Sequence, residues 1–269
     1  MKTYSIKVVD AFTTRPFGGN PAGVVTEAVG ITPSEMQQIA NEMNLVETTF
    51  VLPPTVPEAD FLIRYFTPQN EVAIAGHPTI ATIQALIDEG KIRLPNRSHQ
   101  VRVETGAGVL PVEITVFPEV RNEITLTMAT PRFEDAGLSH EEMASLLGTG
   151  SENLDCRYAI QKMYTGIYWL VVRLNSLAAI QNLRPDWNAI AELSRVKGVV
   201  GIQVFTTETV DPECHFHIRT FLPNEGINED PVCGTGNSCV GAFLVQNGIV
   251  NTNGHIRLVS EQGLEVGRP

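Results

Sequence analysis

Two segments of the chain share one arrangement of residues, and this internal similarity constrains the fold more than any other feature. Segment 64–90 reads RYFTPQNEVAIAGHPTIATIQALIDEG, and segment 219–248 reads RTFLPNEGINEDPVCGTGNSCVGAFLVQNG. Each begins as a strand of the form Arg-x-Phe and continues through a proline and an acidic loop to a small residue followed by glycine. Each then becomes an apolar helix that ends at glycine. Because self-similarity of this kind indicates an internal duplication, the sequence predicts two similar α+β halves.

Two helix-start signatures support this division, since one of them precedes each copy. TPSE at 32–35 is a capping box with proline at the first helical position, and it opens a helix predicted over 33–43. SHEE at 139–142 is a second capping box, which opens a short helix predicted to run to Leu147. The alternative to duplication is a chance similarity between two ordinary strand-loop-helix units.

The rest of the chain predicts further strands and the boundary between the halves. VRVET, VEITV and ITLTM alternate apolar and polar residues, and YWLVVRL is more continuously apolar, so all four are predicted strands. A third helix is predicted to begin near Asp186. The best linker candidates are FPEVRN (117–122) and ATPRFEDAG (129–137). The halves are therefore predicted as 1–120 and 121–269.

Composition and charge narrow the possible classes of function. The chain has 269 residues, of which 43% are hydrophobic and 18% charged, enough for a sizeable core. A formal charge of −11 repels phosphate backbones, so nucleic acid is not an expected partner. The N-terminal residues alternate like a strand rather than a signal peptide, and no apolar run approaches about 18 residues, so no membrane span is expected. The four cysteines lack CxxC spacing, which favours free thiols and a cytoplasmic protein.

The two predicted helix starts, at Ala75-Gly76 and Cys233-Gly234, are the strongest candidates for a ligand site. A helix N-terminus presents unpaired N–H groups and the positive end of the helix dipole, and glycine lets a ligand approach that backbone closely. One such start can bind a carboxylate, and two facing each other across a cleft between the halves would clamp a small acid. The GTGNS stretch lacks the GxxxxGK pattern of a P-loop, so a phosphate is not the expected ligand.

Four side chains have functional groups suited to proton transfer or substrate binding, and each also has an ordinary structural explanation. Cys233 lies where a helix dipole lowers a thiol pKa, but it is equally interpretable as a small buried residue. Asp230 would hydrogen-bond a substrate amino or hydroxyl group, or else cap the turn that follows it. His77 would be a neutral hydrogen-bonding group at its helix start, or a cap of that helix. Glu47 begins an apolar strand and would carry a proton if desolvated, although chemistry alone favours a solvent-facing glutamate there.

A metal site is not expected. His215 and His217 alternate on one strand and share a face, as two metal ligands would. No third ligand has a suitable spacing, and Arg219 lies on the same face. The chain also lacks a Ser-His-Asp pattern and a nucleotide-binding fingerprint. It therefore offers proton-transfer groups without a cofactor motif.

Five segments together resemble the PhzF-like family of phenazine-biosynthesis isomerases, over nearly the whole chain. They are VDAFTTRPFGGNPAGVV (9–25), NLVETTF (44–50), RYFTPQNEVAIAGHPTIA (64–81), EDPVCGTGN (229–237) and QGLEVGRP (262–269). The resemblance implies the α+β fold of diaminopimelate epimerase, with two pseudo-symmetric domains that each wrap a β-barrel-like sheet around a central helix. The central helices would be those at about 78–89 and 236–247, in agreement with the duplication.

The resemblance also implies roles for individual residues. Glu47 matches the family's glutamate that moves a proton between two carbons of a dihydro-hydroxyanthranilate ring. His77 and Asp230 match a histidine and an aspartate that orient the substrate and assist the transfer, and Thr235 keeps the hydroxyl of the family's serine. The resemblance implies a homodimer, and neither a metal nor an organic cofactor. The residues expected to bind a small-molecule carboxylate substrate are Asn20, Gly76, Cys233, Gly234 and Thr235.

The chain departs from the family's pattern in two places. Phenazine-making members usually have threonine where this chain has Cys233, and CGTG instead resembles the second half-site of related epimerases and proline racemases. Those enzymes use two thiols, whereas the first thiol position corresponds here to Ala75, which carries no proton. Family members usually continue past GRP by a few tens of residues that supply closing strands, so these strands are expected to be missing after Pro269.

The sequence therefore predicts a cofactor-independent isomerase of a small carboxylated, cyclic or amino-bearing metabolite, with Glu47 as acid and base. Two alternatives stay open at this stage. One is an amino-acid epimerase or racemase that uses Cys233 as one of its bases. The other is a duplicated scaffold that binds small acids without catalysis, which would be favoured if Glu47 were exposed and far from the ligand site.

Overall fold

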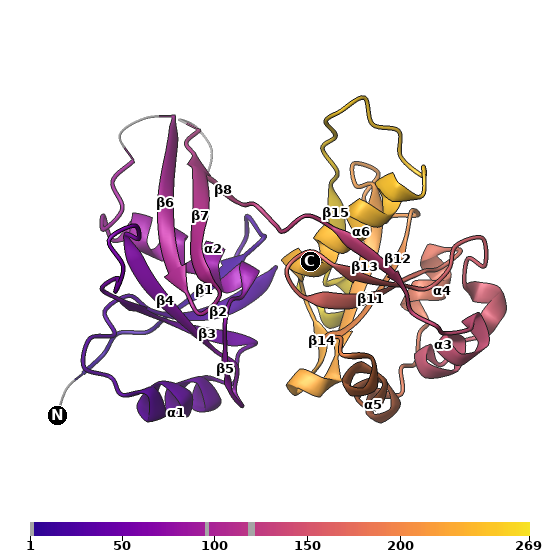
Figure 1. The fold of residues 1–269 in the computed structure, drawn as a ribbon, viewed down its shortest axis with the longest axis horizontal. Coiled ribbons are helices and arrows are strands. Elements are labelled where there is room, and N and C mark those ends of the chain that lie inside the picture. Colours follow the sequence, from indigo (N-terminus) through magenta and orange to yellow (C-terminus); the bar gives the residue numbers. More distant parts are fainter. Residues whose placement is uncertain (1–2, 95–96, 118–121) are drawn as a thin grey trace. The chain divides into compact units, whose positions relative to one another are not determined.

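The computed structural model describes residues 3–94, 97–117 and 122–269 (Figure 1). These residues form two compact units, unit 1 over Met1–Thr127 and unit 2 over Met128–Pro269. The predicted boundary between residues 120 and 121 lies in the segment 118–121, outside the described residues, as does most of the linker candidate 117–122. The position of that boundary therefore stays a prediction.

The described residues of unit 1 form one sheet and two helices. Its strands run in the order β1-β2-β3-β4-β6-β7-β8, and β5 pairs with β4. The pairs β2–β3 and β4–β6 are parallel, and the other pairs are antiparallel. The elements are β1 (Lys7–Ala11), β2 (Asn20–Val25), α1 (Pro33–Met43), β3 (Glu47–Leu52), β4 (Phe61–Phe66), β5 (Glu71–Val72), α2 (Gly76–Asp88), β6 (Ser98–Thr105), β7 (Gly108–Thr115) and β8 (Glu123–Leu126).

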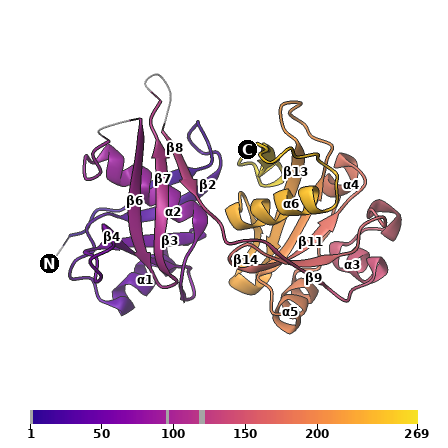
Figure 2. The same cartoon turned by 45° about the horizontal axis from the view of Figure 1, so that its top comes forward.

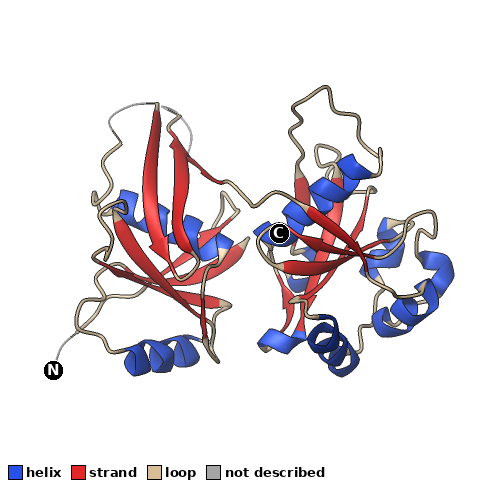
Figure 3. Cartoon of the chain, viewed as in Figure 1, coloured by secondary structure: helices blue, strands red, loops and turns tan. Residues whose placement is uncertain are grey.

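The sheet of unit 1 curves around α2 (Figure 3). Helix α2 packs against β1, β2 and β3 near one end of the strand order and against β8 at the other end. Its buried residues therefore lie around most of the helix, and they include Ile83 and Leu86, which join the apolar core between helix and sheet. Helix α1 covers the opposite face, where Met36 and Ala40 pack with Phe50. The predicted central helix is confirmed, and it begins two residues earlier than expected, at Gly76.

Unit 2 has the same kind of sheet with more helices around it. Its strands run in the order β14-β13-β12-β11-β10-β9, and β15 pairs with β13. The pairs β11–β12 and β13–β15 are parallel. The elements are β9 (Arg132–Asp135), α3 (His140–Leu147), η1 (Ser151–Asn153), β10 (Gln161–Tyr164), β11 (Tyr168–Arg173), α4 (Leu177–Gln181), α5 (Trp187–Lys197), β12 (Gly201–Thr206), β13 (Phe216–Leu222), η2 (Pro223–Glu225), β14 (Ile227–Asp230), α6 (Gly234–Gln246), β15 (Ser260–Gln262) and η3 (Leu264–Val266).

Both faces of the unit 2 sheet are covered. Helix α6 packs against β11 and β12 (Figure 2), and its residues Val240 and Phe243 belong to one apolar core. Helices α4 and α5 pack against β12, and Ile180 and Ile190 belong to a second core that includes α3. Helix α6 thus occupies the place in unit 2 that α2 occupies in unit 1.

The strand pairing confirms the predicted duplication. Strands β1 to β6 of unit 1 correspond in order to β10 to β15 of unit 2. Along both series the first pair is antiparallel, the second parallel, and the third and fourth antiparallel. The last strand of each series lies parallel to the fourth, which forms the β4–β6 and β13–β15 pairs. Chance similarity does not produce the same order and directions over six strands.

The two helices that begin with capping boxes, α1 and α3, do not correspond to each other in the duplicated fold. Both boxes are present, on Thr32 for α1 and Ser139 for α3, and each helix precedes its copy as predicted. However, α1 connects the parallel strands β2 and β3, and the matching connection between β11 and β12 is made by α4 and α5. The counterpart of α1 is therefore α5, which begins next to Asp186 as predicted and has this residue as its N-cap. A capping box marks a helix start but carries no information on topology.

The Arg-x-Phe motif has the same geometry in both units. Arg64 donates two hydrogen bonds to the carboxylate of Glu71, at 2.7 and 2.6 Å. Arg219 donates two hydrogen bonds to Glu229, at 2.8 and 2.7 Å. Each guanidinium group also lies over the ring of the motif's own phenylalanine, at 5.2 and 5.0 Å from the ring centroid. The two pairs differ in burial, because the Arg64 and Glu71 side chains are 23% and 42% exposed and those of Arg219 and Glu229 only 8% and 11%.

Candidate functional site

Glu47 lies at the junction between α1 and β3. Helix α1 ends at Asn44, which adopts a left-handed conformation with φ 50°, and β3 begins three residues later at Glu47. Glu47 pairs with Ala22 of the parallel strand β2. Its side chain is only 15% exposed, so it is not the solvent-facing strand-end residue that chemistry alone favoured. Its Oε2 lies 3.4 Å from Nε2 of His77.

His77 is the second residue of α2 and is 5% exposed. Its Nδ1 lies 3.2 Å from Nδ2 of Asn20, which is fully buried at the start of β2. The other ring nitrogen, Nε2, faces Glu47. Burial lowers the pKa of His77 to about 3, against a hydrogen bond with the Pro21 backbone that raises it. The ring is therefore neutral near pH 7, as predicted, but mainly because it is buried.

The start of α2 has open space beside Gly76. The N-cap residue Ala75 provides no side-chain hydrogen bond to the helix. A Cβ atom added at Gly76 would have no neighbouring atom within 4 Å. The first turn of α2 thus combines backbone N–H groups, the positive end of the helix dipole and free space next to His77. This arrangement is suited to binding an anionic group.

In unit 2, the corresponding first turn of α6 is capped by the thiol of Cys233. Asp230 ends β14 and is 6% exposed, and Cys233 is the N-cap of α6. Cys233 Sγ accepts a hydrogen bond from the backbone N of Gly236 at 3.4 Å and lies 3.5 Å from Oγ1 of Thr235. Thr235 Oγ1 in turn accepts from Nε1 of Trp169 at 3.1 Å. Cys233 is therefore buried, as its structural explanation expected, and it also caps α6, which does not conflict with a chemical role.

The predicted site residues form two groups, and each group is assembled within one unit. The unit 1 group is Asn20, Glu47, Gly76 and His77, and the unit 2 group is Asp230, Cys233, Gly234 and Thr235. The two helix starts are matched by the duplication, so Cys233 occupies the place of Ala75 and Thr235 the place of His77. The chain thus has a carboxylate and an imidazole in one unit and a carboxylate, a thiol and a hydroxyl in the other.

A loop next to the unit 1 group has features that the sequence did not reveal. The hairpin between β1 and β2 contains Phe12 and Phe17, whose φ angles are 61° and 65° and which are 45% and 83% exposed. The backbone N of Phe17 donates to Oδ2 of Asp10 at 2.9 Å. Bulky residues rarely adopt this left-handed conformation, and such strain concentrates near functional sites.

Sequence reasoning also missed Gln262 as a site residue. It lies in the QGLEVGRP segment, where no periodic pattern or chemical motif marks it out. In the structure it ends β15 and accepts a hydrogen bond from the backbone N of Cys233. The available signal was its place among the segments that resemble the family.

The two histidines predicted to share a strand, His217 in β13 and His215 just before it, form structural contacts. His217 is fully buried, and its two ring nitrogens lie 2.8 Å from Glu261 Oε1 and 3.0 Å from Glu265 Oε1. His215 Nδ1 accepts from the backbone N of Val259 at 3.1 Å. Among the described residues, no group of three or more potential metal ligands is arranged to hold an ion. Within the same residues, no helix is long and apolar enough to cross a membrane.

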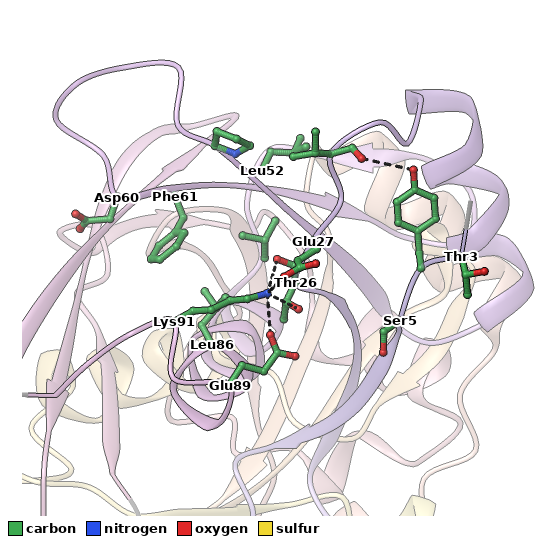
Figure 4. Close-up of a pocket in the computed structure, with 14 residues that line it drawn as sticks. Thr3, Ser5, Thr26, Glu27, Leu52, Asp60, Phe61, Leu86, Glu89 and Lys91 are labelled. Atoms are coloured by element: carbon green, nitrogen blue, oxygen red, sulfur yellow. Dashed lines mark hydrogen bonds and ion pairs between the residues drawn. The ribbon is translucent and has the colours of Figure 1, made fainter. Parts of the chain in front are cut away.

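A pocket of about 740 Å³ in unit 1 does not contain the predicted site residues (Figure 4). Its lining includes Leu86 and Glu89, which place it at the C-terminal end of α2, away from His77. Lys91 points into a cluster in which its ammonium group bonds to Glu89 at 2.9 Å and Glu27 at 3.0 Å. Three of the charged groups that line this pocket, those of Glu27, Glu89 and Lys91, are thus engaged with one another.

Comparisons with known proteins agree with the two-unit fold and with the family resemblance of the sequence. Residues 9–269 match the sequence model of the family described as phenazine biosynthesis-like protein. An uncharacterized isomerase of Clostridium acetobutylicum is 34% identical over 271 residues, which cover 100% of this chain and 88% of that protein. The trans-2,3-dihydro-3-hydroxyanthranilate isomerase of Pseudomonas chlororaphis is 31% identical over 263 residues, covering 97% and 86% of the two chains.

Solved structures are similar over the whole chain. The crystal structure of a PhzF-family phenazine biosynthesis protein from Bacillus anthracis has a TM-score of 0.90 and 34% identity, and the match covers 100% of this chain and 88% of that one. A hydroxyproline epimerase from Agrobacterium vitis has a TM-score of 0.60 at 16% identity, with coverage of 95% and 81%, which indicates a shared fold alone. With the two-unit architecture, these similarities confirm the predicted diaminopimelate epimerase-like fold.

Proposed function

The chain belongs to the phenazine biosynthesis-like protein family and is an isomerase, and we propose that it moves a proton between two carbons of a small carboxylated metabolite without a cofactor. The expected substrates are cyclic or carry an amino group. Trans-2,3-dihydro-3-hydroxyanthranilate, the compound named for the Pseudomonas chlororaphis relative, is the first compound to test.

The observation that carries this proposal is the largely buried Glu47 carboxylate facing a neutral imidazole. Glu47 removes a proton from one carbon of the substrate and returns it to another. With a pKa lowered to about 3, His77 is a poor proton acceptor near neutral pH, so the transferred proton stays on Glu47. The imidazole, with Nε2 at 3.4 Å from Oε2 of Glu47, orients the carboxyl group. The open start of α2 at Gly76 stabilises negative charge that develops on the substrate.

The unit 2 group is assigned to substrate binding in the same proposal. The backbone N–H groups at the start of α6, around Gly234 and Thr235, bind the acidic group of a substrate. The carboxylate of Asp230 hydrogen-bonds an amino or hydroxyl group and assists the transfer. Asn20 acts in unit 1 by holding the His77 ring through Nδ1.

Replacing Glu47 by glutamine tests the proton-transfer role. In D2O, the wild type should incorporate deuterium into trans-2,3-dihydro-3-hydroxyanthranilate during turnover, detected by mass spectrometry and NMR. Glu47→Gln should abolish this incorporation and leave binding, measured by calorimetry, near normal. Glu42→Gln is the matched control, because Glu42 is exposed on α1 and should behave as the wild type. Retained exchange in Glu47→Gln would refute the role.

An epimerase that uses Cys233 as one base is the second candidate. It is favoured by the Gly236 N–H, which donates to Cys233 Sγ and would stabilise a thiolate. The test uses Cys233→Ser with trans-4-hydroxy-L-proline and L-proline, scored by inversion and by deuterium at the α-carbon. Near-full activity of Cys233→Ser on any turned-over substrate excludes a thiol base.

The non-catalytic alternative and the homodimer have separate tests. A scaffold that only binds acids would be favoured by an exposed Glu47, whereas the Glu47 side chain is 15% exposed, which favours catalysis.

The expected homodimer is checked by sedimentation velocity, where a monomer at micromolar concentration would contradict it.

A further inference from the structure

Gln262 makes hydrogen bonds to three different parts of the segment that carries the unit 2 group. It is 7% exposed at the end of β15. Its Oε1 accepts from the backbone N of Cys233 at 3.3 Å and from Nδ2 of Asn237 at 2.8 Å. Its Nε2 donates to the carbonyl oxygen of Asp230 at 2.9 Å. One carboxamide thus links the strand before the turn, the N-cap and the first turn of α6.

The same carboxamide is joined to buried polar side chains beneath α6. Gln262 Nε2 also donates to Oγ1 of Thr220 at 2.9 Å, and Thr220 Oγ1 donates to Oε1 of Gln203 at 2.7 Å. Thr220 and Gln203 are both fully buried. Gly236 lies against Gln203, because a Cβ atom at this position would overlap the Gln203 carboxamide. The start of α6 therefore rests on a fixed polar layer that includes Gln262.

The orientation of the Gln262 carboxamide follows from its partners. The carbonyl of Asp230 only accepts a hydrogen bond, and the backbone N of Cys233 only donates one. Nε2 must therefore face Asp230, and Oε1 must face Cys233. A carboxylate or an apolar side chain of similar length satisfies only part of this pattern, or none of it.

The link is specific to unit 2. The position in unit 1 that matches Gln262 is Thr105, because Glu104 and Glu261 pair with matching residues of β4 and β13. The Thr105 hydroxyl donates to the carbonyl oxygen of Gly108 in the hairpin of β6 and β7, at 2.8 Å, rather than to α2. The duplicated fold therefore does not itself require a link at this position. Its presence in unit 2 coincides with the helix start that carries Asp230 and Cys233.

We propose that Gln262 is a positioning residue that holds the turn 230–237 in one arrangement, so that its backbone N–H groups and the Asp230 carboxylate meet a substrate without rearrangement. This inference rests on the proposed function for the use of the turn. Gln262 is not assigned a catalytic step, because its carboxamide is committed to protein partners.

Hydrogen exchange of the backbone tests the link without a substrate. Gln262→Met keeps the length of the side chain and removes its hydrogen bonds, whereas Gln262→Glu keeps an acceptor and loses the donor. Both variants should exchange about tenfold or more faster than the wild type over residues 230–238, with unchanged exchange in β10, β11 and β12. Gln246→Glu is the control, because Gln246 is exposed at the other end of α6. Equal acceleration throughout unit 2, or no acceleration, would overturn the proposal.

The pH dependence of the two variants separates positioning from loss of packing. When protonated, the introduced carboxyl group regains a donor and resembles the original carboxamide. The exchange of Gln262→Glu, divided by that of the wild type at the same pH, should fall back toward one as the pH is lowered to about 4 to 5. The titratable groups nearest to Gln262 are Asp230, His217 and Glu261, and the Gln262→Met variant, measured over the same pH range, is the control for them. The ratio for Gln262→Met should stay constant, and parallel behaviour of both variants would overturn the proposal.

Activity provides the second measurement. With trans-2,3-dihydro-3-hydroxyanthranilate, both Gln262 variants should lose kcat/KM on the order of 100-fold, as small misplacements of substrate-positioning groups do. Full kcat/KM together with lost local protection would overturn the positioning role. If the wild type does not turn the compound over, the proposed substrate is wrong, and the exchange experiment still decides whether Gln262 holds the turn.

Discussion

The two copies of the Arg-x-Phe motif allow one interaction to be tested at two degrees of burial. In Glu229→Gln, the guanidinium group of Arg219, 8% exposed, loses its carboxylate partner. Breaking a buried ion pair from one side costs about 3–5 kcal/mol of the free energy of unfolding. In Glu71→Gln, the pair is 23% and 42% exposed, and such pairs contribute only about 0.2–1 kcal/mol. The same substitution is therefore expected to destabilise unit 2 several times more than unit 1.

The positions of the tryptophans make this difference measurable. Trp169 and Trp187 both lie in unit 2, and the sequence contains no other tryptophan, so their emission reports the unfolding of unit 2. With a urea m-value of about 2 kcal/mol/M, a loss of about 3 kcal/mol lowers the midpoint by about 1.5 M. Unit 1 is followed by hydrogen exchange in β4 and β5. Equal losses in both units, or a shift below about 0.5 M in Glu229→Gln, would refute the argument from burial.

Two further predictions concern the stability of unit 2. Burial lowers the pKa of His217, but hydrogen bonds with two glutamates outweigh it and raise the pKa above the usual 6.5. The charged ring therefore contributes stability that is complete below about pH 6.5 and is lost as the pH rises through the folded-state pKa. His217→Gln should remove this pH dependence of the free energy of unfolding, measured by urea titrations that follow tryptophan emission. An unchanged dependence of that free energy on pH would contradict the prediction. Gly236→Ala should cost about 1–3 kcal/mol, because the new methyl group overlaps the buried carboxamide of Gln203. Its control Gly241→Ala should be neutral or stabilise by about 0.5–1 kcal/mol, since its methyl group meets only a leucine methyl at 3.8 Å; equal effects would argue against the overlap.

Local signals in the sequence predicted the elements whose ends are fixed by local chemistry. The capping boxes on Thr32 and Ser139, and the start predicted near Asp186, gave three helices with nearly correct starts. The duplication was predictable because the Arg-x-Phe strand and the glycine-flanked helix start recur together. The correspondence of α1 with α5 was not predictable, since it depends on which strands lie parallel.

The site was predictable in its chemistry and less so in its environment. Glu47 and His77 were expected to serve one site, and the structure places them 3.4 Å apart. Burial rather than the helix dipole is the main cause of the neutral imidazole, and burial follows from the packing of β2 against α2. Gln262 was missed because its partners, Asp230 and Cys233, lie far from it in the sequence.

The edge strands of the unit 2 sheet affect whether copies of the chain associate through their sheets at high concentration. Among the strands that the structure describes, β9, β14 and β15 each pair with a single other strand of this sheet, and they have only three or four residues. Strand β9 reads RFED, with exposed charges at Arg132, Glu134 and Asp135. An unpaired strand invites a second molecule to continue the sheet, and short length and charge both discourage this. The margins of this sheet therefore resist fibre-like growth, and removing the charges of β9 would weaken that protection.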